Sequence, residues 1–136
     1  METSKTTNSK IRKAAENKRA LLAVERIVLE CGVRADLNGC AYLTEAATVY
    51  AAYPDAKLTD IYGAVGSRHG VKPKTVMREI NYAVAQAFDV AEKLSALIGV
   101  RIPRAQVHGG LIIAYIGKLY SNPDLRRRDK TNGGER

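Results

Sequence analysis

Basic side chains gather in one stretch of the sequence that holds no acidic residue. From Ile61 to Arg78 there is no Asp or Glu, while cations occur at Arg68, Lys72, Lys74 and Arg78. Such a cluster attracts polyanions, and contacts to phosphates position a protein on a nucleic acid without reading its sequence. We therefore expect Arg68, Lys72 and Lys74 to contact phosphates.

The other reactive side chains do not form a pattern typical of catalysis. His108 has no Ser, Cys or carboxylate partner that the pattern suggests, and His69 is more simply interpreted as a helix cap. Cys31 and Cys40 are not spaced as zinc ligands, so we expect reduced, partly buried thiols. The glycines between residues 63 and 70 follow no predicted strand and are not a nucleotide-binding loop. We therefore predict no enzyme activity, no cofactor and no metal site.

The elements that would position the cations are predicted to be helices. Apolar residues recur at three- and four-residue spacing, with Gly32, Pro54, Gly70 and Gly99 as stops and Asn38-Gly39 as a turn. No strand pattern is convincing. The spacing predicts an all-α, five- or six-helix bundle with helices near residues 21–31, 43–53, 58–69, 73–98 and 103–119. Gly109-Gly110 would lie inside the last helix, at a close contact or a kink.

The helices expected on either side of Gly70 fit a helix-turn-helix. Gly66 would allow the two helices to cross closely, Gly70 would tolerate a positive φ, and Val76 would lock the pair. Pro73 is favoured at a first helical position. A recognition helix starting near Pro73 would place its first turns in the major groove of a DNA duplex.

That recognition helix would present polar side chains opposite its apolar line. Arg78 suits the O6 and N7 atoms of guanine, and Asn81 suits adenine, each through two hydrogen bonds. Tyr82 and Met77 could meet a thymine methyl group or pack at the core edge, and Thr75 could meet a base or a phosphate. The predicted base-edge candidates are therefore Thr75, Met77, Arg78, Asn81 and Tyr82.

The ends of the chain carry much of the charge. The net charge is +8, and residues 1–20 hold six basic against two acidic groups. We predict a flexible basic tail at 1–16, a helical domain at 17–121 and a second flexible basic tail at 122–136. No apolar run could span a bilayer and no signal peptide is recognised, which favours a cytoplasmic protein.

The stretch from Val24 to Tyr120 resembles a known DNA-binding domain. Asn38 to Ala46 (N-G-C-A-Y-L-T-E-A) and the Pro73-led helix up to Ala87 are similar to motifs of the stage-zero sporulation response regulators, in their C-terminal effector domain. The resemblance implies a six-helix bundle with a helix-turn-helix, dimers on tandem sites of double-stranded DNA, and contact with RNA polymerase or a related regulator. It also implies a location on the nucleoid.

The recognition helix departs from the family at most of its charged positions. Arg78 matches, as do the apolar fold positions Val76, Ile80 and Ala83. Only a short basic segment stands where the family has its receiver domain, so we expect no phosphorylation control in cis. The family's other readers are replaced by Thr75, Met77, Asn81 and Tyr82.

These departures leave two hypotheses open. The first is a sequence-specific regulator of transcription that binds double-stranded DNA. The second is a protein-interaction module that kept the bundle and lost DNA reading, and that acts as an antagonist of a related regulator. Nonspecific binding through the basic tails is a third and weaker idea.

Overall fold

The computed structural model describes residues 10–87 and 89–124. These residues are helical and include no strand, so the predicted all-α fold is confirmed. A short helical segment at residues 10–14 precedes six α-helices and one 3-10 turn. In chain order they are α2 (Lys18–Glu30), α3 (Asn38–Ala52), α4 (Leu58–His69), α5 (Pro73–Gln86), α6 (Val90–Ile98), η1 (Arg104–Gln106) and α7 (Gly109–Ser121).

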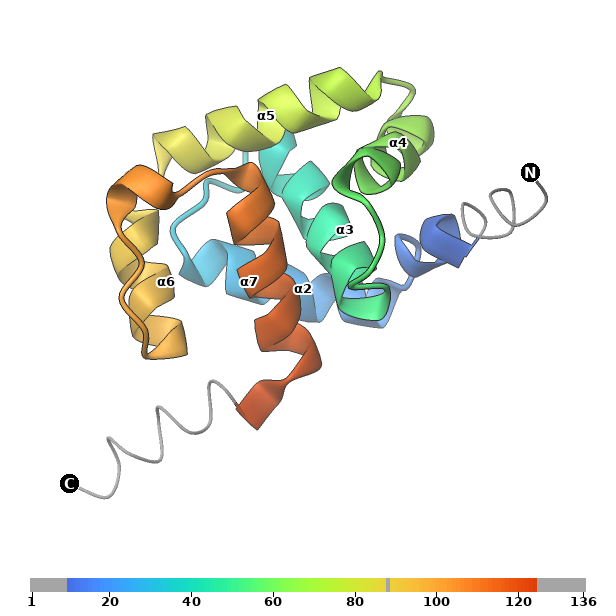
Figure 1. Ribbon diagram of the computed structural model, residues 1–136. Helices are drawn as coiled ribbons and strands as arrows, with labels where there is room; N and C mark the ends of the chain where they lie inside the picture. Colours follow the sequence, from blue (N-terminus) through green and yellow to red (C-terminus); the bar gives the residue numbers. More distant parts are fainter. Residues whose placement is uncertain (1–9, 88, 125–136) are drawn as a thin grey trace.

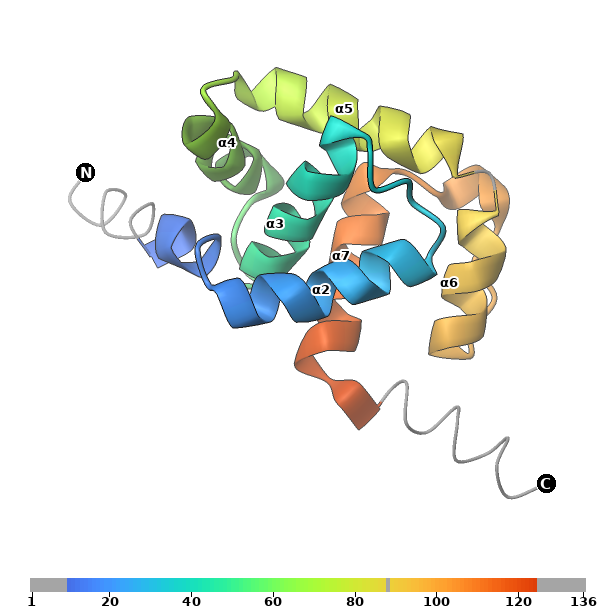
Figure 2. The same ribbon diagram turned by 180° about the vertical axis from the view of Figure 1, so that it is seen from behind.

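Helix α3 is the centre of the bundle. It packs against α2, α4, α5 and α7, and of its residues from Gly39 to Val49 all except the exposed Ala41 are buried. A helix that is buried over most of its surface lies inside a protein, and the small residues Ala46 and Ala47 let the neighbouring helices approach it closely. Figures 1 and 2 show α5 along one side of the bundle and α2 along the opposite side, with α4 and α6 at the two ends.

Helix α4 and the start of α5 lie where the sequence predicted them. Helix α4 ends at His69, and Gly70 then adopts φ 69°, which L side chains rarely adopt. The Val71 N–H donates to the Gly66 carbonyl at 2.9 Å and closes the helix end. Pro73 is the first residue of α5, so a turn of three residues joins the two helices. Two packed helices and this turn form the frame in which the cations lie.

Three predicted boundaries are wrong. The helix predicted at 73–98 divides into α5 and α6, since the apolar spacing continues through a bend of the backbone at Ala87. The last helix begins at Gly109, after the separate turn η1, so the two glycines start α7 instead of interrupting it. Asn38-Gly39 is the start of α3 instead of a turn.

Gly39 lies where α3 crosses α5, and the crossing leaves no room for a side chain. A Cβ at Gly39 would overlap the carbonyl oxygen of Glu79 on α5. Glycine therefore allows α3 and α5 to cross with their backbones in contact.

The predicted N-terminal tail is also wrong in its second half. Residues 10–14 are helical, and the side chains of Ile11 and Ala15 are buried in the main core. Ile11 has few apolar neighbours in the sequence, so no periodic pattern of apolar residues indicated that it is buried. The tail prediction for residues 1–9 and 125–136 lies outside the described residues.

Candidate nucleic-acid interface

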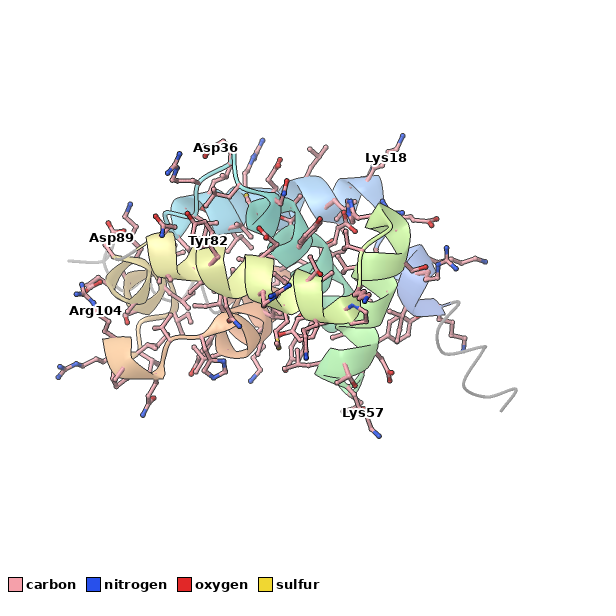
Figure 3. The ribbon with its side chains drawn as sticks, turned by 90° about the horizontal axis from the view of Figure 1, so that it is seen from above. Lys18, Asp36, Lys57, Tyr82, Asp89 and Arg104 are labelled. Carbon is pink, nitrogen blue, oxygen red and sulfur yellow. The ribbon has the colours of Figure 1, made fainter. Side chains whose placement is uncertain are left out.

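Helix α5 has one face in the core and one face in solvent. Val76, Ile80, Ala83 and Val84 are buried, as the apolar spacing predicted. Lys74, Arg78 and Tyr82 follow one another at four-residue spacing and are exposed, Tyr82 by 54%. Residues four apart lie on one side of a helix, so the three form a single stripe. Figure 3 looks down on this side and shows α5 lying across it.

The turn before α5 sets how closely the two helices meet. A Cβ at Gly66 would stand 2.5 Å from the carbonyl oxygen of Val71, so the turn folds directly onto α4. Val76, one turn into α5, is fully buried. The three fold roles assigned to Gly66, Gly70 and Val76 match this geometry. The use of the pair as a DNA-binding helix-turn-helix stays a prediction.

The cations of the acid-free stretch differ in what surrounds them. Lys72, Lys74 and Arg78 are exposed, and within residues 10–87 and 89–124 no ion pair is found for any of them. Cations without a carboxylate partner lose no intramolecular pair when they meet an anion. We therefore define the basic face of α5 as Lys72, Lys74, Arg78 and the exposed Tyr82.

Arg68 does not belong to that face, and its prediction as a phosphate contact is corrected. Its Nε donates to Glu45 at 3.0 Å, and its second guanidinium nitrogen lies 3.3 Å from the Glu16 carboxylate. Two carboxylates already neutralise this guanidinium, whose side chain is only 27% exposed. It fastens α4 to α3 and to the N-terminal segment.

Glu45 completes this cluster, and sequence reasoning missed it. Its carboxylate, in a side chain only 9% exposed, also lies 2.6 Å from Nε2 of His69. The ring of His69 packs against Tyr42 at 4.9 Å between centroids. His69 therefore joins α4 to α3 instead of acting only as a helix cap. Because the partners are more than twenty residues apart, no local pattern could indicate them.

Two of the five base-edge candidates hold contacts inside the protein. The side-chain oxygen of Asn81 accepts a hydrogen bond from Gly109 N at 2.8 Å, so Asn81 fixes α7 to α5. Two-point recognition of adenine uses that same oxygen, so the bond to Gly109 N competes with the predicted base contact of Asn81. Met77 is partly buried and packs against the core, contrary to its expected exposure. Thr75 is partly buried in the first turn, while Arg78 and Tyr82 face solvent.

The sequence predicted partly buried thiols, and both thiols are buried. The side chain of Cys31 is fully buried, and that of Cys40 is 3% exposed. Burial, with the nearby carboxylates of Glu25 and Asp36, raises the pKa of the Cys40 thiol above its ordinary value. A thiol held in its protonated form is a poor nucleophile and a poor metal ligand. Among the described residues no group of three or more His, Cys, Asp or Glu side chains could hold a metal ion.

Comparison with known proteins gives no relative for this chain: no family model, no curated protein and no solved structure matches it. The resemblance to the sporulation regulators therefore stays a prediction. Within the described part of the chain, no helix is long and apolar enough to cross a membrane.

Proposed function

We propose that this protein binds double-stranded DNA through the basic face of α5 and regulates transcription. The observation that carries the proposal is the position of Lys72, Lys74 and Arg78. They stand at the start and along the exposed side of an amphipathic helix, with no carboxylate partner in the described structure. A helix with a solvent-facing basic edge fits the major groove of a duplex.

The residues of the basic face would contact different parts of the duplex. Lys72 and Lys74 flank Pro73 at the start of α5 and would hold phosphates, which fix register. Arg78, one turn further on, would bind a guanine edge through two hydrogen bonds. Tyr82 would lie on a sugar or a thymine methyl, and Thr75 would reach the backbone. The finer form of the proposal, a cytoplasmic, nucleoid-bound dimer on tandem sites that contacts RNA polymerase or a related regulator, rests on the family resemblance alone.

The protein-interaction module is kept as a second candidate because of Asn81 and Met77. Both were expected to read bases, and both hold contacts inside the protein. With fewer free readers, α5 would discriminate less well between sequences. A domain of this kind would show no preferred duplex at any salt concentration.

Fluorescence anisotropy with duplexes selected from a random pool tests the proposal. We expect a preferred duplex bound at least about a thousandfold more tightly than random DNA. Arg78→Ala should weaken the preferred duplex by about ten- to a hundredfold, the equivalent of one bidentate base contact. Lys74→Ala should weaken all duplexes alike and reduce the slope of log K against log salt by about 0.9.

Arg26→Ala is the matched control, since Arg26 is an exposed arginine on α2, on the opposite side of the bundle (Figure 1). It should leave both affinity and salt slope unchanged. Equal weak binding to all duplexes, with no effect of Arg78→Ala, would reject the proposal and favour the interaction module.

A further inference from the structure

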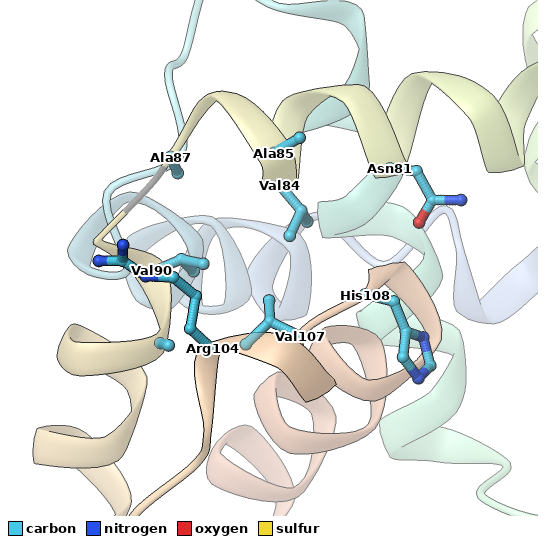
Figure 4. Close-up of a pocket in the computed structure, with 9 residues that line it drawn as sticks. Asn81, Val84, Ala85, Ala87, Val90, Arg104, Val107 and His108 are labelled. Carbon is cyan, nitrogen blue, oxygen red and sulfur yellow. The ribbon is translucent and has the colours of Figure 1, made fainter.

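A cleft lies behind the second half of α5, on the side that faces α6 and α7. It has a volume of about 350 Å³, within the range of pockets that hold small organic molecules. Valine and alanine side chains from α5, α6 and the segment before α7 form its walls. In Figure 4, Val84 and Val107 face one another across its middle. The apolar wall is made by Val84, Ala85, Ala87, Val90, Ala91 and Val107.

Among the described residues that line the cleft, those with polar side chains lie at its two ends. Arg104 rises from η1 toward the α5–α6 junction at one end, and Asn81 and His108 lie at the other (Figure 4). Water fills such a space poorly along its apolar middle, because a bound water needs two or more polar partners. A ligand for this cleft therefore needs an apolar body of a few carbon atoms.

The hydrogen bonds already made at the two ends determine which hydrogen-bonding groups a ligand needs. The side-chain oxygen of Asn81 already accepts from Gly109 N, which leaves its amino group as a donor. Nδ1 of His108 accepts from Leu111 N at 3.4 Å, so a neutral ring carries its proton on Nε2, which is then also a donor. The guanidinium of Arg104 can only donate. Residues with hydrogen-bond donors thus line both ends of the cleft, and one of them, Arg104, is a cation.

The carboxylate of Glu92 already accepts from one of the N–H donors of Arg104. One terminal nitrogen of its guanidinium lies 3.0 Å from the Glu92 carboxylate, in a pair whose side chains are 64% and 60% exposed. An exposed pair of this kind contributes little, and a guanidinium has five N–H groups. Arg104 can therefore keep Glu92 and still bind a second carboxylate.

We propose that this cleft binds a small organic acid: a short apolar chain or ring with a carboxylate at the Arg104 end and an acceptor group at the Asn81–His108 end. The acceptor group is a second carboxylate, a carbonyl or a hydroxyl, since each of these accepts a hydrogen bond from an amide N–H or an imidazole N–H. The inference is independent of DNA binding, because none of the lining residues belongs to the basic face of α5.

Titration of the 15N-labelled protein with three matched six-carbon compounds, followed by NMR, tests the assignment. Adipate, hexanoate and hexylamine share an apolar chain and differ in their ends. We expect saturable shifts at Val84, Ala85, Ala91 and Val107, with adipate tighter than hexanoate and hexylamine without saturable shifts at these residues. Arg104→Gln should weaken both acids by about five- to tenfold, the loss of one charge-assisted hydrogen bond at an exposed site.

Two further variants separate loss of the site from loss of the fold. Arg101→Gln removes an exposed arginine three residues before Arg104 that does not line the cleft, and should leave the affinities unchanged. Val107→Phe fills the middle of the cleft and should abolish binding while the rest of the spectrum stays native. Equal binding of hexylamine and hexanoate, shifts confined to other parts of the protein, or an unchanged affinity in Arg104→Gln would each overturn the proposal.

Discussion

Among single residues, Glu45 joins two side chains of α4 to α3. One carboxylate oxygen meets Arg68 at 3.0 Å and the other meets His69 at 2.6 Å, in a side chain that is almost buried. Two helices and the N-terminal segment are therefore held at one point, since Arg68 also reaches Glu16. Removal of the Glu45 carboxylate would leave Arg68 paired with Glu16 alone among the described residues and would take away the hydrogen-bond partner of His69 Nε2.

We expect Glu45→Gln to lower the free energy of unfolding by about 2 kcal/mol, less than for a fully buried pair because Arg68 and His69 are partly exposed. Urea unfolding followed by circular dichroism measures the change. The control is Glu92→Gln, which breaks the exposed pair with Arg104 and should cost under about 0.5 kcal/mol. Equal losses in the two variants would contradict the role given to Glu45.

The thiol of Cys40 makes stability depend on pH in the alkaline range. Burial raises its pKa above the ordinary value of 9.0, and burial likewise raises the pKa of Tyr62. The unfolded chain therefore loses these protons at lower pH than the folded chain. This contribution to stability is complete below about pH 9 and is lost as pH rises through the raised folded-state values.

We expect the urea midpoint of the native protein to fall as pH is raised above about 9. Cys40→Ala should make that fall less steep, compared with its own midpoint at pH 7. A slope that is the same with and without the thiol would show that Cys40 does not titrate differently in the folded state.

At the scale of elements, the α4–α5 pair was predictable because its determinants are local. Gly70 supplies a positive φ, Pro73 starts a helix, and the apolar spacing within each helix gives its buried face. The boundaries of α6 and α7 were not predictable in this way. The apolar spacing continues across the bend at Ala87, and only the need to cover the core separates α5 from α6.

Two glycines of α4 give a test of how the turn packs. Gly66→Ala would place a Cβ 2.5 Å from the Val71 carbonyl oxygen, whereas nothing lies within 4 Å of a Cβ at Gly63. We expect Gly66→Ala to destabilise the protein by about 1–3 kcal/mol through strain in the turn, and Gly63→Ala to stabilise it by about 0.5–1 kcal/mol. Thermal unfolding measures both, and a stabilising Gly66→Ala would contradict the close approach of the turn.

At the scale of the whole molecule, the sequence predicted the all-α class and missed the contacts between distant segments. The cluster around Glu45, the bond from Gly109 to Asn81 and the burial of Ile11 all join residues that no short pattern relates. For the candidate site, the exposure of Arg78 and Tyr82 followed from helix periodicity. The internal contacts of Arg68, Asn81 and Met77 depend on neighbouring helices and could not be inferred.

The burial of Ile11 in the N-terminal segment leads us to expect that a mutation far from the candidate interface lowers stability. Ile11 is 1% exposed within the main core, so Ile11→Ala should lower the free energy of unfolding by about 2–4 kcal/mol. Lys13→Ala, an exposed neighbour on the same segment, should change it by less than about 0.5 kcal/mol. If both variants unfold like the native protein in urea, this segment contributes nothing to the core.

The most direct test of DNA binding by α5 is an NMR titration of the 15N-labelled protein with its preferred duplex. We expect the largest amide shifts at residues 72–82 and unchanged amides along α2, on the opposite side of the bundle. Shifts concentrated on α2 with α5 unchanged, or no shifts in the presence of any duplex, would contradict the proposed function.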